Sequence, residues 1–347
     1  MKPAKIRNYG CRIKDSATYK DMRCLFLENR YLRVGILLDK GSDIFEFLYK
    51  PLDMDMVWLS PFGISNPQRF NLTKSQPAGR FMDYYQGGWQ EIFPNGGGSC
   101  QYQGVEWGQH EEAALLPWSY RILRDEPEQI EVELSTEIRA MPLRLVKRLR
   151  LVKDQAELFI EEEAVNLSSV DLEVVWGHHL AYGRPFLGPG CTINIPAAKG
   201  KVYEHKSALD ENIRPGTTFS WPHLPLTDGG TVDLSLIAGD NVQTAKFLYL
   251  SGLDQGRYEI INPRENIRLM VKWDKKVMPY VWYWQEFNKT RGYPWYKMSR
   301  VFGLEPFSTD IMGLDKTVAE GRGITIASGS QVHNSLTIGL SAINKEN

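Results

Sequence analysis

The chain has 347 residues, of which 42% are hydrophobic and 24% are charged, values typical of a globular protein. Its formal net charge is −1 and it contains no long basic run, which argues against a nucleic-acid-binding protein. No stretch approaches the roughly 20 apolar residues of a membrane-spanning helix, and no apolar segment follows the basic N-terminus, so we expect neither a membrane protein nor a secreted one.

The first predicted elements are two β-strands, at residues 31–37 and 43–49, with a turn at residues 40–42 between them. The next long stretch, residues 60–100, is rich in Pro, Gly, Asn and Gln. Long irregular segments within a compact domain are often functional, although plain surface decoration is the alternative.

A glycine-rich segment at residues 87–98 leads to a single histidine, His110. The glycines lack the following Lys-Ser/Thr and helix of a phosphate-binding loop. His110 stands in a Gln-His-Glu-Glu sequence, which lacks the spacing of a zinc motif. We therefore expect no metal here and take His110 as a candidate ligand contact.

Three consecutive strands are predicted at residues 129–134, 143–152 and 157–165. Basic residues on the middle strand and glutamates on its neighbours suit pairing across an antiparallel meander.

A strand at residues 174–183 carries two adjacent histidines, which must point to opposite faces. The neighbours on the His178 face are bulky, as in a core. Those on the His179 face are Gly177, Ala181 and Gly183, which leave room for a ligand. We expect His179 to line a cleft and His178 to be packed; the alternative is that both are structural.

A later strand, residues 300–307, places Glu305 beside Gly303 on the face opposite Phe302 and Leu304. A partly buried carboxylate next to a space-clearing glycine is a candidate catalytic base, because burial raises its pKa toward the working pH. The alternative is a glutamate at the rim of the sheet in a salt bridge. Further strands are expected at residues 246–250, 257–261, 268–273 and 335–340. Residues 1–347 are therefore expected to form one large all-β domain.

In order along the chain, these segments resemble the aldose 1-epimerase (galactose mutarotase-like) family. The matching motifs are Phe93-Pro94-Asn95, His110 before Leu116-Pro117-Trp118, His179-Leu180-Ala181-Tyr182 and Leu304-Glu305-Pro306. The resemblance runs from about residue 20 to the C-terminus and implies a β-supersandwich with a carbohydrate site in an open cleft.

The resemblance also implies roles for individual residues. Glu305 would take the proton of the anomeric hydroxyl, and protonated His179 would donate to the ring oxygen. The implied substrate contacts are His110, Asn95, Trp282, Trp284 and Gln285. Where many members carry Pro-Asn-Arg this chain has Gly96, and Arg80 is a candidate replacement for the missing arginine. No confident match exists for the family's hydroxyl-binding aspartate.

The leading hypothesis is an enzyme that interconverts the anomers of an aldose or a modified sugar, without a metal or cofactor. The alternatives are a sugar-binding or regulatory protein without turnover, and another epimerase, lyase or hydrolase reaction on the same scaffold. Four widely spaced cysteines suggest reduced thiols in a cytoplasmic protein. The expected partner is a small carbohydrate, with no nucleic acid and no membrane, and the protein is expected to be a monomer or a homodimer.

Overall fold

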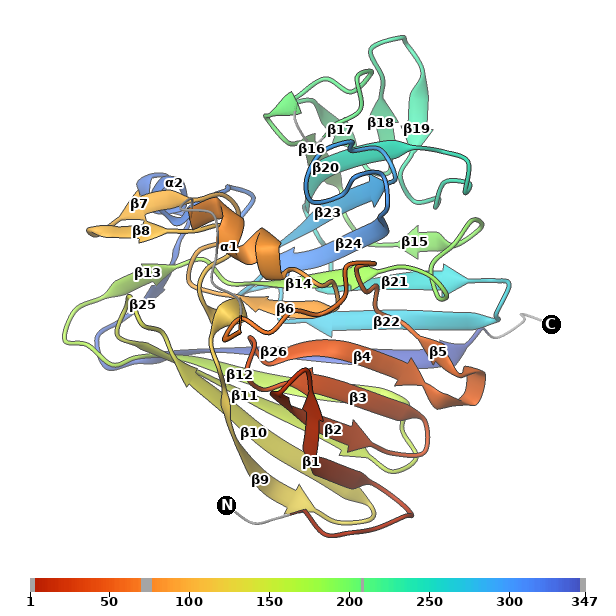
Figure 1. Cartoon of the computed structure of the whole chain (residues 1–347). Coiled ribbons are helices and arrows are strands. Elements are labelled where there is room, and N and C mark those ends of the chain that lie inside the picture. Colours follow the sequence, from red (N-terminus) through yellow and green to blue (C-terminus); the bar gives the residue numbers. More distant parts are fainter. Residues whose placement is uncertain (1–3, 70–76, 207–208, 344–347) are drawn as a thin grey trace.

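The computed structural model describes residues 4–69, 77–206 and 209–343, which form two large antiparallel sheets (Figure 1). The first is 12-stranded and runs, in spatial order, β1 (Arg12–Tyr19), β2 (Met22–Glu28), β3 (Leu32–Leu37), β4 (Asp43–Tyr49), β6 (Trp89–Ile92), β14 (Gly177–Tyr182), β24 (Arg300–Phe307), β23 (Tyr280–Phe287), β20 (Thr244–Ser251), β16 (Lys199–Val202) and β17 (Thr218–Ser220), with β5 (Met54–Asp55) paired to β4.

The second sheet is 8-stranded and carries the predicted meander. Its order is β15 (Thr192–Asn194), β21 (Arg257–Asn262), β22 (Ile267–Trp273), β26 (Gln331–Ala342), β12 (Glu157–Asn166), β11 (Leu143–Val152), β10 (Gln129–Glu137) and β9 (Ser119–Asp125). The expected charge pairing is confirmed, because Arg148 of β11 contacts Glu133 of β10 at 3.0 Å and Glu163 of β12 at 2.9 Å.

The remaining described elements are short. They are the strand pairs β13 (Leu172–Val174) with β25 (Ile324–Ile326), β18 (His223–Pro225) with β19 (Thr231–Asp233) and β7 (Cys100–Tyr102) with β8 (Val105–Trp107), the helices α1 (Pro77–Tyr84) and α2 (Leu314–Ala319), and the 3₁₀ turns η1 (Lys50–Leu52) and η2 (Ala113–Leu115). The all-β prediction is therefore confirmed. Among the described helices, none is long and apolar enough to cross a membrane.

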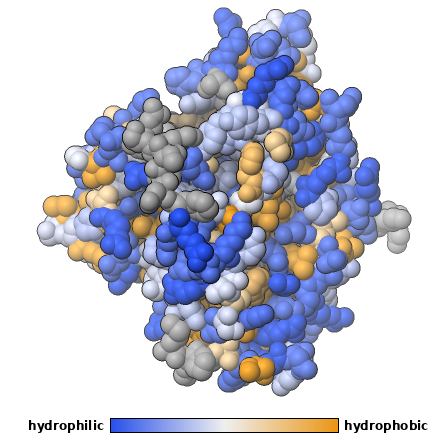
Figure 2. Space-filling model, viewed as in Figure 1, coloured by the Kyte–Doolittle hydropathy of each residue, from blue (hydrophilic) through white to orange (hydrophobic). Residues whose placement is uncertain are grey.

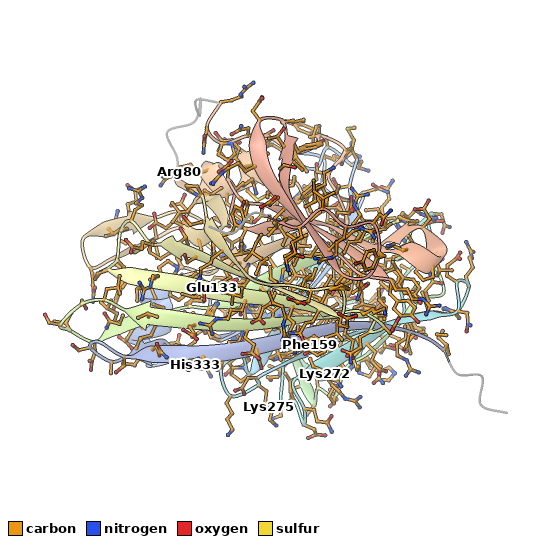
Figure 3. The ribbon with its side chains drawn as sticks, turned by 90° about the horizontal axis from the view of Figure 1, so that it is seen from below. Arg80, Glu133, Phe159, Lys272, Lys275 and His333 are labelled. Atoms are coloured by element: carbon orange, nitrogen blue, oxygen red, sulfur yellow. The ribbon has the colours of Figure 1, made fainter. Side chains whose placement is uncertain are left out.

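The main core lies between the two large sheets. Alternate residues of β12, such as Leu158 and Ile160, point inward and are almost fully buried, while Phe159 and its alternate neighbours point outward. Figure 3 looks onto the outer face of the 8-stranded sheet, where Glu133, Phe159, Lys272 and His333 are labelled. In the view of Figure 2 the surface is mainly hydrophilic, with apolar side chains scattered among polar ones.

The two faces of the 12-stranded sheet have different surroundings. His178 points toward the 8-stranded sheet, where its Nε2 lies 3.0 Å from Glu162 Oε2 of β12. We call this the core face, and the opposite face, to which His179 points, the site face. In Figure 1, α1 lies over the middle of the site face, near β14 and β24.

Candidate active site

His179 and Glu305 meet on the site face, although 126 positions separate them in the sequence. β14 and β24 are hydrogen-bonded neighbours whose register pairs Ala181 with Gly303 and Gly177 with Phe307. This register sets His179 opposite Glu305. His179 Nε2 lies 3.6 Å from Glu305 Oε1, and the two residues are 7% and 1% exposed. The two side chains that strand parity assigns to this face therefore meet in the structure.

The small residues beside this pair make the approach possible. A Cβ at Gly303 would lie 2.4 Å from Glu305 Oε1, so any side chain there would displace the carboxyl group. A Cβ at Gly177 would lie 2.3 Å from the Phe307 ring. Glycine at both positions therefore allows close packing of the two strands.

Aromatic side chains cover the pair. Ring centroids of Tyr85, Trp284 and Phe81 lie 5.0, 5.6 and 6.0 Å from that of His179. Phe81 and Tyr85 come from α1 and the residue after it, four positions apart and so on one side of a helical turn. This segment therefore folds over the pair, which is less exposed than the predicted open cleft implies.

His110 also belongs to this site. Its ring centroid lies 5.5 Å from that of His179 and 4.8 Å from that of Phe81. The backbone N–H of Gly97 donates to His110 Nδ1 at 3.1 Å, so a neutral His110 carries its proton on Nε2. His110 can therefore donate one hydrogen bond from Nε2.

Burial favours the uncharged form of each group. It lowers the pKa of His179 to about 3 and raises the pKa of Glu305 well above the ordinary value. Burial, and then proximity to His179, lowers the pKa of His110 well below its ordinary value. His179 Nδ1 and Glu305 Oε1 have no hydrogen-bond partner among the described residues. Polar atoms left in this state are suited to a polar ligand.

The two predicted tryptophans share the site face but differ in position. Trp284 is half-buried and contacts His179 and Trp295, at 5.6 and 5.2 Å between centroids. Trp282 is fully buried, stacks on Phe307 at 3.8 Å, and donates its N–H to the Thr309 carbonyl at 2.7 Å. Of the two, Trp284 therefore offers a ring face close to His179 and Glu305.

Three other predicted contacts lie elsewhere. The Asn95 amide donates to the Gly98 and Gly108 carbonyls and its oxygen accepts from the Leu314 N–H, so it holds neighbouring loops together. Gln285 points to the core face, because it alternates with Trp284 along β23. Arg80 pairs with Glu111, its Nε lying 2.9 Å from Oε1. We leave all three out of the site.

The described residues contain one group with the donor types of a metal site, Glu91, Glu162 and His178. Protein donors already contact both carboxylates. Lys147 Nζ lies 3.2 Å from Glu91 Oε2, the Trp176 N–H donates to Glu91 at 2.5 Å, and Asn334 donates to Glu162 at 2.9 Å. We regard this cluster, which joins the core face to the 8-stranded sheet, as structural and call it the inter-sheet network.

Several residues near the pair were missed in the sequence. Phe81 and Tyr85 have helical spacing, but Pro77 and Gly79 beside them are typical of a loop. Gln90 lies directly opposite His179 in the register of β6 and β14, and Asp43 contacts it from β4. Only the order of strands in the sheet reveals these two, and that order is not visible in a single sequence.

Comparison with solved structures identifies the fold. A proposed aldose 1-epimerase of Klebsiella pneumoniae superposes with a TM-score of 0.73 at 15% identity, over 95% of this chain and 83% of that one. A galactose mutarotase-like protein of Clostridium acetobutylicum gives 0.66 at 14% identity, over 96% and 99%. A galactose mutarotase related enzyme of Lactobacillus acidophilus gives 0.58 at 16% identity, over 93% and 99%.

These structures have the galactose mutarotase-like β-sandwich fold, and the same fold is present here, as the resemblance in the sequence implied. At this level of identity the likeness concerns the fold alone. A comparison with curated protein sequences finds no match. One family covers residues 20–340, nearly the whole chain, and its description states no activity. The chain therefore belongs to the family described as Domain of unknown function (DUF4432).

Proposed function

We propose that this protein is an aldose 1-epimerase, which interconverts the α and β anomers of a sugar by opening and closing its ring. The observation that carries the proposal is the buried contact of His179 with Glu305, at 3.6 Å on the site face. An imidazole and a carboxyl group are the general acid and base that this reaction needs. The fold shared with mutarotase-like proteins and the neighbouring His110 support it.

In the proposed reaction, Glu305 takes the proton of the anomeric hydroxyl while His179 donates a proton to the ring oxygen. The bond between C1 and the ring oxygen breaks and a C1 carbonyl forms. Rotation about the C1–C2 bond then presents the other carbonyl face, and the ring closes with both proton transfers reversed. Each positioned group contributes about 10²–10⁴-fold to the rate. His110 Nε2–H would hydrogen-bond a sugar oxygen.

The directions of the pKa shifts fit a pair that shares one proton. Protonated Glu305 with neutral His179 is the favoured arrangement in the buried site, because burial raises the pKa of Glu305 and lowers the pKa of His179. Ring opening produces the same protonation states, because Glu305 receives a proton and His179 loses one in that step. The site is thus suited to the open-chain form of the sugar, and hydrogen bonds from the cyclic sugar offset the cost of the charged arrangement.

A sugar reaches the pair only if the covering side chains of Phe81 and Tyr85 move aside. Both contact the His179 ring, and His179 itself is 7% exposed. Trp284 and Trp295 lie in the same aromatic group. We therefore expect sugar binding to change the tryptophan fluorescence of the protein.

NMR exchange spectroscopy on a panel of free aldoses and sugar acids tests the proposed function. The expected result is catalysed α/β exchange for at least one sugar, in proportion to enzyme concentration. Binding without faster exchange would instead favour the non-catalytic sugar-binding protein. New product signals in place of a shifted anomer ratio would point to another reaction on this scaffold.

Replacement of Gly303 by alanine is expected to lower the exchange rate at least about tenfold, because the new methyl group displaces the Glu305 carboxyl. The cost in folding free energy should stay within about 1–3 kcal/mol, since the contacted atom ends a side chain. Gly188→Ala is the control, because a Cβ at Gly188 meets nothing within 4 Å. An equal exchange rate in Gly303→Ala and Gly188→Ala would show that anomer exchange does not depend on the position of the Glu305 carboxyl.

A further inference from the structure

Beside His179, four buried polar side chains form a connected group that the proposed mechanism does not use. Asp43 Oδ2 accepts from Lys40 Nζ, from Gln86 Nε2 at 2.8 Å and from Gln90 Nε2 at 3.4 Å. Each of the four residues is at most 1% exposed. We call Lys40, Asp43, Gln86 and Gln90 the Asp43 cluster.

The Asp43 cluster adjoins the catalytic pair. Gln90 is the direct partner of His179 in the antiparallel pairing of β6 with β14, and such partners have side chains on the same face about 5 Å apart. Gln86 follows Tyr85, whose ring contacts His179 at 5.0 Å. Burial, followed by the nearby carboxyls of Glu305 and Asp43, raises the pKa of Tyr85 well above its ordinary value.

The cluster has a surplus of hydrogen-bond acceptors. Asp43 Oδ1, Gln86 Oε1 and Gln90 Oε1 are buried and have no hydrogen-bond partner within the described part of the chain. Glu305 Oε1 also lacks a partner, and it lies on β24, on the other side of β14 from the cluster. Buried acceptors without donors are costly, so this arrangement is suited to a ligand that supplies O–H groups.

The same arrangement is unsuited to a phosphate or sulfate group. Such a group brings negative charge and mostly acceptor oxygens, which would face the acceptors of Asp43 and the two glutamines. Lys40 is the cation of the cluster, and its ammonium is already paired with Asp43. A charged substituent would therefore lack a free counter-charge in this cluster.

We propose that the Asp43 cluster is a subsite for adjacent, unmodified hydroxyl groups of the sugar whose anomeric carbon lies between His179 and Glu305. This inference rests on the proposed function for the position of the sugar ring. Gln90 and Gln86 accept hydrogen bonds from these hydroxyls through their Oε1 atoms, and Asp43 holds the two glutamine amides in place through Oδ2. The subsite excludes a phosphate ester at these positions.

The test compares Gln90→Leu and Gln86→Leu with the wild-type chain. Binding is measured by calorimetry, first on D-glucose, D-galactose, D-mannose and D-xylose, and then on the monodeoxy analogues and the phosphate esters of the sugar that binds most tightly. The wild type should prefer the parent sugar over one or two deoxy analogues by at least about tenfold, and each variant should lose that preference at one hydroxyl.

Asn334→Leu is the matched control. Asn334 is also a buried amide whose oxygen lacks a partner among the described residues, but it belongs to the inter-sheet network. The Asn334→Leu variant should retain the wild-type preference for the parent sugar over each deoxy analogue. Circular dichroism checks that each variant is folded. If one glutamine variant does not fold, binding to the other glutamine variant tests the subsite.

Wild-type discrimination retained in the glutamine variants would overturn the subsite, even if anomer exchange persists. Tighter binding of a phosphate ester than of the parent sugar, lost in Gln90→Leu, would overturn the exclusion of charge. Binding without exchange, with discrimination lost in the variants, would sink the proposed catalytic function and leave the subsite standing.

Discussion

Replacement of Glu305 by glutamine is expected to slow anomer exchange by about 10²–10⁴-fold, because the amide cannot accept the anomeric proton. The substitution preserves shape, so the sugar should still bind with an affinity close to that of the wild type. Exchange is measured by NMR and binding by calorimetry on the same sample. His179→Asn should show the same separation, and the double variant should lose little more than either single one, since the two groups act as a unit.

Glu259→Gln is the matched control for this experiment. Glu259 is also largely buried, but it lies on β21 of the other sheet beside Arg257 and Arg268. Its exchange rate should equal that of the wild type. If Glu305→Gln exchanged anomers as fast as this control, the proposed mechanism would be abandoned.

The pH dependence of anomer exchange by the wild-type protein is a second test of the His179–Glu305 pair. Below the His179 pKa of about 3 the pair binds two protons, and above the raised pKa of Glu305 it has none. Exchange should therefore be constant between these limits and fall on both sides, with the alkaline limb well above the ordinary glutamate value of 4.5. Both limbs of the pH profile arise from the titration of His179 and Glu305 as a coupled pair. Replacement of either residue should therefore abolish both limbs.

The largest expected effect on stability comes from Lys147→Met in the inter-sheet network. Lys147 is 5% exposed and its Nζ lies 3.2 Å from Glu91, with Glu162 close by. Removal of its charge takes one cation away from the buried carboxyls of Glu91 and Glu162 and leaves His178 beside them, which costs up to about 3–5 kcal/mol in the free energy of unfolding at neutral pH. Urea denaturation measures this loss, and Lys272→Met, an exposed change on the same sheet (Figure 3), should stay within about 0.5 kcal/mol.

The loss in Lys147→Met should depend on pH in a defined direction. Burial alone would raise the pKa of Glu162, but His178 and then Lys147 outweigh it and lower that pKa from 4.5 to about 2. A depressed pKa stabilises the fold above the unfolded value of 4.5, and this contribution is lost as the pH falls through about 2. The difference between wild type and variant should shrink over the same range. A constant difference would mean that Lys147 contributes through packing alone.

The parts of the site that could be predicted from sequence are those set by strand parity. The tiny neighbours of His179 and Gly303, two residues before Glu305, indicated which face carries the site. The register of β14 with β24 confirms that His179 and Glu305 meet there. The same reasoning assigned His178 to the core, where it contacts Glu162. Parity also excludes Gln285 from the site face, because Gln285 alternates with Trp284 along β23.

The parts that could not be predicted depend on contacts between distant segments. The Asp43 cluster exists because β4 and β6 are neighbours in the sheet, an order that local patterns do not encode. The covering position of α1 depends on Phe81 and Tyr85 packing against His110 and His179. Asn95 matched a family motif by type, yet its amide is used up by backbone groups of nearby loops.

The peptide bond between His178 and His179 links two environments that are otherwise separate. The imidazole of His178 contacts Glu162 between the two sheets, and the imidazole of His179 lies beside Glu305 on the site face. A one-residue slip of Gly177–Tyr182 against its neighbouring strands would turn both rings over at once. Homologous chains that keep the contact of His179 with Glu305 must therefore align through this hexapeptide without a gap, whatever the variation in the loops around it.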